Sequence, residues 1–156
     1  NFGKNYGLTL YGSRALMSMR LEKNWGAWGL DYRPDFTAAE SGLDQFINWK
    51  KEFVGKSFCL QEKEKGAEKK LCTMVVKTNE IDVINDEAIL KEHKCIGYVS
   101  SGGYAHFINK SIAFGYIPTE IIRQNSSLQI EINGKFYSAK IISEPLYDPG
   151  GIKMRS

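Results

Sequence analysis

The sequence has no long apolar run and no marked excess of one charge. No stretch of about eighteen apolar residues occurs in its 156 residues, so we expect no membrane-spanning helix and no membrane partner. The 21 Lys and Arg residues nearly balance the 18 Asp and Glu residues, and a net charge of +3 is too small to indicate a nucleic-acid partner. The N-terminus also lacks the charged and then apolar pattern of a signal peptide. Lysines and glutamates alternate over residues 62–70, which predicts a solvent-exposed helix face.

Cysteine and histidine are scarce. Cys59, Cys72 and Cys95 are odd in number and form no C-x-x-C, so the sequence predicts neither a disulfide framework nor a zinc site. We expect three small buried thiols and a reducing compartment, either the cytoplasm or the mitochondrial matrix. His93 and His106 have no acidic or cysteine neighbours at metal-ligand spacing, and we expect no metal site. We expect His93 to be exposed and His106 to orient a loop or a partner surface.

Familiar catalytic motifs are absent, and so is an initial methionine. The sequence contains no G-x-S-x-G, no H-E-x-x-H and no Cys–His pairing, so we expect no catalytic residue in this chain. It begins at Asn1 with NFGKNYGLTLYG, whose aromatic and aliphatic side chains need cover. We therefore expect the chain to be a piece of a longer protein, with the chemistry held in the part that precedes it.

The first half of the sequence predicts a mixed αβ segment. Ser13 can cap a helix that runs to Glu22, and Arg20, beside the apolar side of this helix, needs a specific carboxylate or carbonyl acceptor. Glycines and a proline make residues 24–36 a loop. Residues 43–56 alternate loosely enough to predict a short strand, and residues 56–65 predict a helix closed by Gly66.

From about residue 68 the apolar period shifts to two. Short strands are expected over 70–77, 95–101, 110–118, 128–132 and 135–143. Asn133-Gly134 predicts a type I′ hairpin turn, and Gly102-Gly103 predicts a glycine turn. The predicted fold is α+β, with an αβ piece over residues 1–67 and a small antiparallel β-barrel over residues 68–156.

Four segments, taken in order, resemble the glycine-cleavage T-protein (aminomethyltransferase) superfamily. They are YGSRALMSMRLEKNWGAWGLDYRPDFTAAESGL, FVGKSFCLQEKEKG, GYVSSGGYAHFINKSIAFGYIP and EPLYDPGGIKMR. The Gly-Gly-Tyr-x-His and Tyr-Asp-Pro forms look most like the C-terminal, folate-binding region of dimethylglycine and sarcosine dehydrogenases. Leu16 stands where T-proteins proper carry a cofactor-contacting arginine, which favours the dehydrogenase branch over glycine cleavage itself.

The resemblance implies folate-dependent one-carbon chemistry. An aminomethyl or methylene group would pass from a methylated amine (dimethylglycine or sarcosine), or from a glycine-derived carrier, to tetrahydrofolate. The family's catalytic aspartate would precede Asn1, so this chain alone is expected to be inactive and to pack against the missing N-terminal part of its own protein. FAD is possible in a missing upstream domain. Two alternatives stay open: a non-catalytic T-protein-like module of the RNA-modification or iron–sulfur maintenance type, and a relative of the sulfonium-substrate demethylases.

The resemblance also suggests where folate would bind. We expect the rings of residues 25–36 to cover the seam between the αβ lobe and the barrel, with Trp28 facing a shared pocket. Folate carries carboxylates on its tail, and bidentate arginines suit them, so the predicted cofactor-binding residues are Arg14, Trp28 and Arg155. We expect Glu40 to cap a turn or to pair with Arg20.

Overall fold

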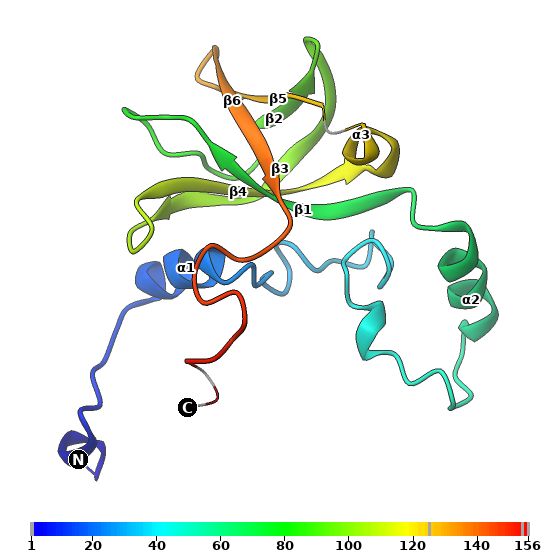
Figure 1. Ribbon diagram of the computed structural model, residues 1–156, viewed down its shortest axis with the longest axis horizontal. Helices are drawn as coiled ribbons and strands as arrows, with labels where there is room; N and C mark the ends of the chain where they lie inside the picture. Colours follow the sequence, from blue (N-terminus) through cyan, green and yellow to red (C-terminus); the bar gives the residue numbers. More distant parts are fainter. Residues whose placement is uncertain (1, 125, 154, 156) are drawn as a thin grey trace.

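A short helical segment is followed by a closed six-stranded antiparallel barrel in the computed structural model, which describes residues 2–124, 126–153 and 155 (Figure 1). The elements are η1 (Phe2–Tyr6), α1 (Ser13–Glu22), η2 (Asp44–Phe46), α2 (Lys56–Lys65), β1 (Lys69–Val76), β2 (Ala88–Lys91), β3 (Lys94–Ala105), β4 (Lys110–Pro118), α3 (Thr119–Arg123), β5 (Leu128–Ile132) and β6 (Lys135–Ile142). The strands follow the order β1-β4-β3-β2-β5-β6 around the barrel. The α+β fold class is confirmed. None of the described helices is long and apolar enough to cross a membrane.

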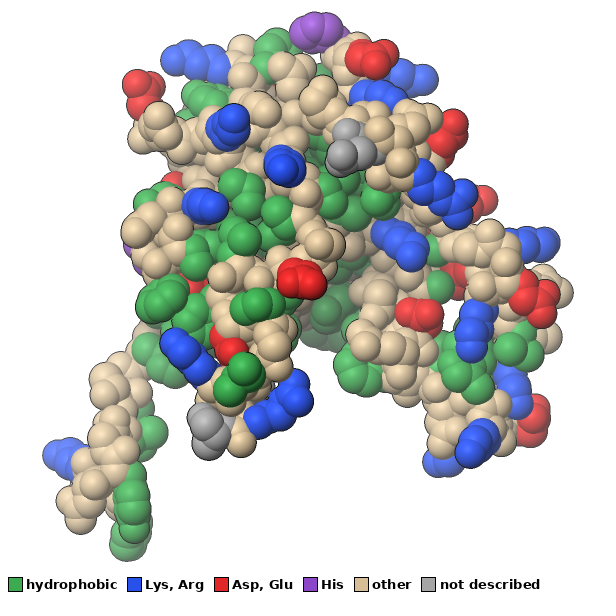
Figure 2. Space-filling model, in the orientation of Figure 1, with side chains coloured by type: hydrophobic (Ala, Val, Ile, Leu, Met, Phe, Trp, Pro, Cys, Tyr) green, Lys and Arg blue, Asp and Glu red, His purple; other side chains and the backbone are tan. Residues whose placement is uncertain are grey.

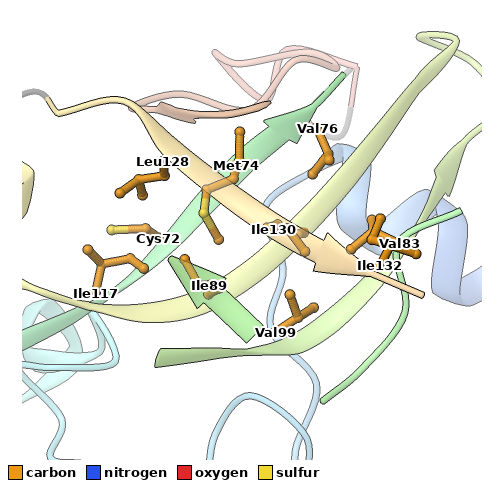
Figure 3. Packing of buried hydrophobic residues seen from close by; sticks show 12 residues of the cluster. Cys72, Met74, Val76, Val83, Ile89, Val99, Ile117, Leu128, Ile130 and Ile132 are labelled. Carbon is orange, nitrogen blue, oxygen red and sulfur yellow. The ribbon is translucent and has the colours of Figure 1, made fainter. Parts of the chain in front are cut away.

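Alternating apolar side chains fill the barrel interior. In β5 the residues Leu128, Ile130 and Ile132 are buried while those between them are partly exposed, as the two-residue period of a strand requires. Met74 and Ile89 point toward the same interior (Figure 3). Burial of each such side chain contributes about 1.5–3 kcal/mol, so the barrel holds its own apolar core.

The five predicted strands are present, and a sixth was missed. β2 has four residues, too few to show a period, and it is recognised only by its pairing with β3 and β5. The predicted hairpin turn between β5 and β6 is confirmed, with positive φ angles of 49° at Asn133 and 75° at Gly134.

The predicted glycine turn at Gly102-Gly103 is wrong. Both residues lie inside β3, where Gly102 pairs with Ala113 and Gly103 with Ile112, and the hairpin turn falls at 106–109. A Cβ atom on Gly102 would stand 2.7 Å from the carbonyl oxygen of Val83. The glycine therefore permits a close backbone approach inside the sheet and does not reverse the chain.

The two predicted helices are confirmed, but the strand predicted over 43–56 is wrong. That segment forms η2 and successive turns, in which Gln45 donates to the carbonyl of Gly42 and the Asn48 side chain accepts from the amide of Lys50. Such local hydrogen bonds compete with a sheet ladder. Gly66, whose φ is 87°, is the C-cap of α2, as predicted.

Three finer expectations about side chains need correction. α1 is preceded by Gly12 as its N-cap, and Ser13 makes no capping hydrogen bond because it is already helical. Only Cys72 is buried; Cys59 is half-buried on α2 and Cys95 is exposed. The Lys-Glu run of residues 62–70 is also not one helix face. α2 ends at Lys65, and the last two lysines of the run, Lys69 and Lys70, begin β1.

The chain after β6 returns to α1 and links the barrel to the helical segment through hydrogen bonds. The amide of Tyr147 donates to the carbonyl of Glu22, and Lys23 Nζ lies 2.7 Å from the carbonyl and 3.2 Å from the carboxylate of Asp148. The amide of Phe107, in the β3–β4 turn, donates to Glu22 Oε1. Figure 1 shows this returning segment beside α1.

Candidate functional site

A buried ion pair joins α1 to the segment of residues 24–36 that follows it, which we call the bend. Arg20 Nη1 lies 2.9 Å from Asp31 Oδ2, and the two side chains are 7% and 0% exposed. Arg20 also donates to the carbonyl of Trp25 and, through Nη2, to Ser101 Oγ at 2.8 Å. The predicted carboxylate and carbonyl acceptors for Arg20 are therefore both confirmed. Because the charges are paired and hydrogen-bonded, they fix the path of the bend without the cost of an isolated buried charge.

A β-bulge brings two consecutive serines to the same carboxylate. Ser100 Oγ donates to Asp31 Oδ1 at 2.5 Å and Ser101 Oγ to Asp31 Oδ2 at 2.9 Å. Consecutive strand residues normally face opposite sides of a sheet, but the register of β3 against β4 shifts between Val99 and Ser101. The bulge thus anchors the bend directly on the barrel.

Glu40 caps a turn and does not pair with Arg20. Its carboxylate accepts from the amide of Thr37 at 3.0 Å, while its own amide donates to Thr37 Oγ1 at 3.1 Å. This reciprocal pair is a capping box. The carbonyl of Glu40 then accepts from the amide of Leu71 on β1, so the turn is tied to the barrel as well.

Between the bend, segment 41–46 and the barrel lies a cleft of about 880 Å³, which we call the seam cleft. Its barrel side comes from β1, Phe114 of β4 and the end of β6. Its other side carries three rings, those of Trp25, Tyr32 and Phe46. Figure 2 shows apolar side chains gathered where the surface is hollowed below the barrel, between the α1 side and the α2 side. The expected concavity between the bend and the barrel is present, but its barrel wall is β1 and β6 and not the predicted glycine turn.

Polar as well as apolar side chains line the seam cleft, among them Asn24, Ser41, Gln45, Lys70 and Thr73. Lys70 is its cation, at the start of β1, and Asn24 lies beside Trp25. The Oδ1 atom of Asn24 is buried and has no hydrogen-bond partner within the described residues. Burial raises the pKa of the Cys72 thiol to about 11, although the charge of Lys70 acts in the opposite direction. Cys72 is therefore protonated at neutral pH and is not a nucleophile.

The structure does not gather the three predicted cofactor-binding residues in the seam cleft. Trp28 is 87% exposed, whereas the half-exposed Trp25 lines the cleft. Arg14 is exposed at the start of α1, and Arg155 donates to the carbonyl of Gly150 in the returning tail. Their roles toward a ligand stay predictions.

Sequence reasoning expected Tyr32 among the rings at the seam but missed Phe46 and Lys70 as cleft residues. The Tyr32 ring folds back onto Gly26, where a Cβ would stand 2.5 Å from it. Lys70 carried no signal, because it sits in an apparently ordinary charged run. Within the described residues no group of three His, Cys, Asp or Glu side chains could hold a metal ion.

Comparison with known families agrees with this architecture. Residues 69–148 match the glycine cleavage T-protein C-terminal barrel domain, and residues 1–51 match the GCVT N-terminal domain. The chain belongs to the glycine cleavage T-protein family. Within that family it is 38% identical to the mitochondrial dimethylglycine dehydrogenase of Rattus norvegicus and 36% identical to that of Homo sapiens, in each case over 94% of this chain.

Other members of the T-protein family are also similar to this chain. An aminomethyltransferase of a Synechocystis species is 32% identical over 90% of the chain. The crystal structure of the glycine cleavage system aminomethyltransferase T from Bartonella henselae superposes with a TM-score of 0.78 over 86% of this chain and 38% of its own, at 24% identity, which supports the fold alone. The chain spans 17% of the length of the dehydrogenases and 38% of that of the Synechocystis protein.

Proposed function

We propose that this chain is the C-terminal part of a folate-dependent one-carbon enzyme. The complete protein would transfer an aminomethyl or methylene group from a methylated amine, such as dimethylglycine or sarcosine, to tetrahydrofolate. The observation that carries the proposal is the seam cleft, with its aromatic walls and single cation, in a chain 36–38% identical to two dimethylglycine dehydrogenases. A glycine-derived carrier is the corresponding donor if the aminomethyltransferase branch applies.

The residues of the seam cleft fit tetrahydrofolate. Trp25, Tyr32 and Phe46 offer flat apolar faces to a pterin or an aminobenzoyl ring. Asn24, which lines the cleft, would offer its side-chain amide to the pterin. Lys70 would attract the carboxylates of the folate tail. These groups would bind and orient the ligand and exclude water, while bound tetrahydrofolate would supply the nitrogens that accept the one-carbon unit.

We also propose ligand contacts for the predicted residues that lie outside the seam cleft. Arg14 and Arg155 are exposed guanidinium groups near α1 and the returning tail, and we propose that they contact the folate carboxylates once the pocket is completed. Trp28 would then cover the ligand where a third wall, absent from this chain, closes the pocket. The division at residues 67 and 68 belongs to the same proposal, with β1 beginning the barrel at Lys69.

That third wall would be the preceding half of the T-protein fold. Exposed apolar side chains line the first nineteen residues, including Leu8, Leu10, Leu16 and Met19. Such a surface is costly to leave in water and suits packing against another part of the same protein. We place the catalytic aspartate in that half, and FAD in a further upstream domain if the dehydrogenase branch applies. The chain alone should not turn over a methylated amine. A reducing compartment, cytoplasmic or mitochondrial, suits its unpaired cysteines.

Isothermal titration of the complete protein with tetrahydrofolate tests the proposal. We expect saturable binding in the micromolar range or tighter, with methylenetetrahydrofolate formed when a methylated amine is supplied. Absence of heat at high micromolar folate would contradict the proposal. Strongly salt-dependent binding to an oligonucleotide would instead favour a nucleic-acid module.

A further inference from the structure

The hydroxyl group of Tyr116 links the two loops that form the non-barrel side of the seam cleft. It donates to the carbonyl of Asp31 at 2.8 Å and lies 2.8 Å from Ser41 Oγ. A phenol has one proton, and that proton is used on Asp31, so the Ser41 hydroxyl must be the donor to the Tyr116 oxygen. One buried atom on β4 therefore holds two loops at once.

Each of these loops carries cleft residues. Asp31 closes the bend that bears Trp25 and immediately precedes Tyr32, both of which line the cleft. Ser41 opens the segment that bears Leu43 and Phe46, which line the same cleft. The relative position of the two loops therefore sets how the rings of Trp25, Tyr32 and Phe46 are arranged around a ligand.

Packing around Tyr116 restrains it to this position. Its ring stacks on Phe36 with centroids 3.5 Å apart and planes 9° apart. The residue is 6% exposed, and its pKa is raised, chiefly because it is buried and despite the hydrogen bond from Ser41. The hydroxyl therefore stays protonated, and remains a donor, throughout the physiological range.

We propose that Tyr116 is a positioning residue for the seam cleft: its hydroxyl sets the distance between the bend and segment 41–46, and thereby the affinity for tetrahydrofolate. The inference rests on the proposed function. Tyr116 itself need not touch the ligand or the reacting atoms, because it acts through Asp31 and Ser41. Its loss should therefore change binding much more than the chemical step.

The test is Tyr116→Phe in the complete protein. This change keeps the ring and its stacking on Phe36 but leaves the Asp31 carbonyl and the Ser41 hydroxyl without their partner. We expect the Kd and KM for tetrahydrofolate to rise about 5- to 20-fold, in line with the loss of one or two buried hydrogen bonds, with kcat changed less than about twofold. Ser41→Ala should raise Kd in the same direction. The double variant should bind about as weakly as Tyr116→Phe alone, because both changes break one linkage.

Tyr98→Phe is the matched control. Its hydroxyl is also hydrogen-bonded, 3.0 Å from Arg33 Nη2, but Tyr98 does not line the seam cleft. We expect unchanged Kd and KM. If Tyr116→Phe and Ser41→Ala both leave the affinity for tetrahydrofolate unchanged, the inference is overturned and the proposed function stands. The inference is also overturned if Tyr98→Phe lowers that affinity as much as Tyr116→Phe does. If the unmodified protein fails to bind tetrahydrofolate, the proposed function fails first and the inference falls with it.

Discussion

At the scale of single residues, the buried Arg20–Asp31 pair joins α1 to the bend, and Ser100 and Ser101 of β3 tie that pair to the barrel. The two side-chain oxygens of Asp31 accept four hydrogen bonds, from Arg20, Ala27, Ser100 and Ser101. Arg20 also donates to the carbonyl of Trp25, and the side chains of Arg20 and Asp31 are both buried. The sequence indicated that Arg20 needed an acceptor because it sits beside apolar neighbours. It could not identify Asp31, since that choice depends on the fold of the bend.

Asp31→Ala should destabilise the protein by about 3–5 kcal/mol, because it leaves the Arg20 charge buried without its partner. Urea unfolding followed by circular dichroism measures this. Glu52→Ala is the control: Glu52 pairs with Lys56 at 2.7 Å but is 89% exposed, so its loss should cost less than about 1 kcal/mol. Equal effects of the two changes would show that the buried pair does not anchor the bend.

Trp28→Ala should change the stability of this chain by less than about 0.5 kcal/mol, since substitutions of exposed side chains are nearly neutral. A fully buried ring would have cost about 3–5 kcal/mol, and the sequence had predicted buried rings here. Thermal unfolding distinguishes the two cases. A loss above about 2 kcal/mol would mean that Trp28 is packed in solution.

Cys72 should react far more slowly with a maleimide at pH 8 than Cys95. Burial both shields the Cys72 thiol and raises its pKa to about 11, so little thiolate forms there. The variant with Cys59→Ser and Cys95→Ser reports on Cys72, and the variant with Cys59→Ser and Cys72→Ala reports on Cys95. Rapid labelling of folded Cys72 would contradict its burial beside the seam cleft.

The raised pKa of Cys72 also predicts a pH dependence of the free energy of unfolding. The contribution of Cys72 is complete below the ordinary thiol pKa of 9.0 and declines as pH rises toward 11.

At the scale of elements, strands with a clear two-residue period were predictable and the others were not. β4 and β5 were found with their correct bounds because each carries alternating or continuous apolar residues between turn signals. β2 is too short to show a period. Segment 43–56 has loose alternation but no strand partner among the described residues, and its polar side chains satisfy local turns.

The consecutive glycines Gly102 and Gly103 of β3 provide a test at this scale. Gly102→Ala should destabilise the barrel by about 1–3 kcal/mol, because the new Cβ would press on the Val83 backbone at 2.7 Å. Gly103→Ala is the matched control: the nearest atom is Leu21 Cδ1 at 3.4 Å, so the change should be nearly neutral. Thermal midpoints measure both. Similar midpoints for the two variants would argue against the close approach of residue 83 to β3.

At the scale of the whole molecule, family and fold could be predicted from ordered motifs, but the site could be predicted only in outline. The seam between the bend and the barrel was expected, but Trp25 lines it where Trp28 had been expected to face it. Trp25 and Trp28 differ in exposure, and their orientation depends on a tight bend closed by hydrogen bonds between Ala27 and Asp31. Lys70 enters the seam cleft through the docking of Glu40 on β1, a contact that no local pattern reveals.

The most direct test of the central claim is the Kd of tetrahydrofolate for the complete protein carrying Trp25→Ala, measured by isothermal titration beside Phe136→Ala. The two rings are similarly exposed, at 50% and 47%, but only Trp25 lines the seam cleft. We predict that Trp25→Ala weakens binding about tenfold or more, as loss of a stacking ring would, while Phe136→Ala leaves it unchanged. Unaltered binding in both variants would show that folate does not occupy the seam cleft.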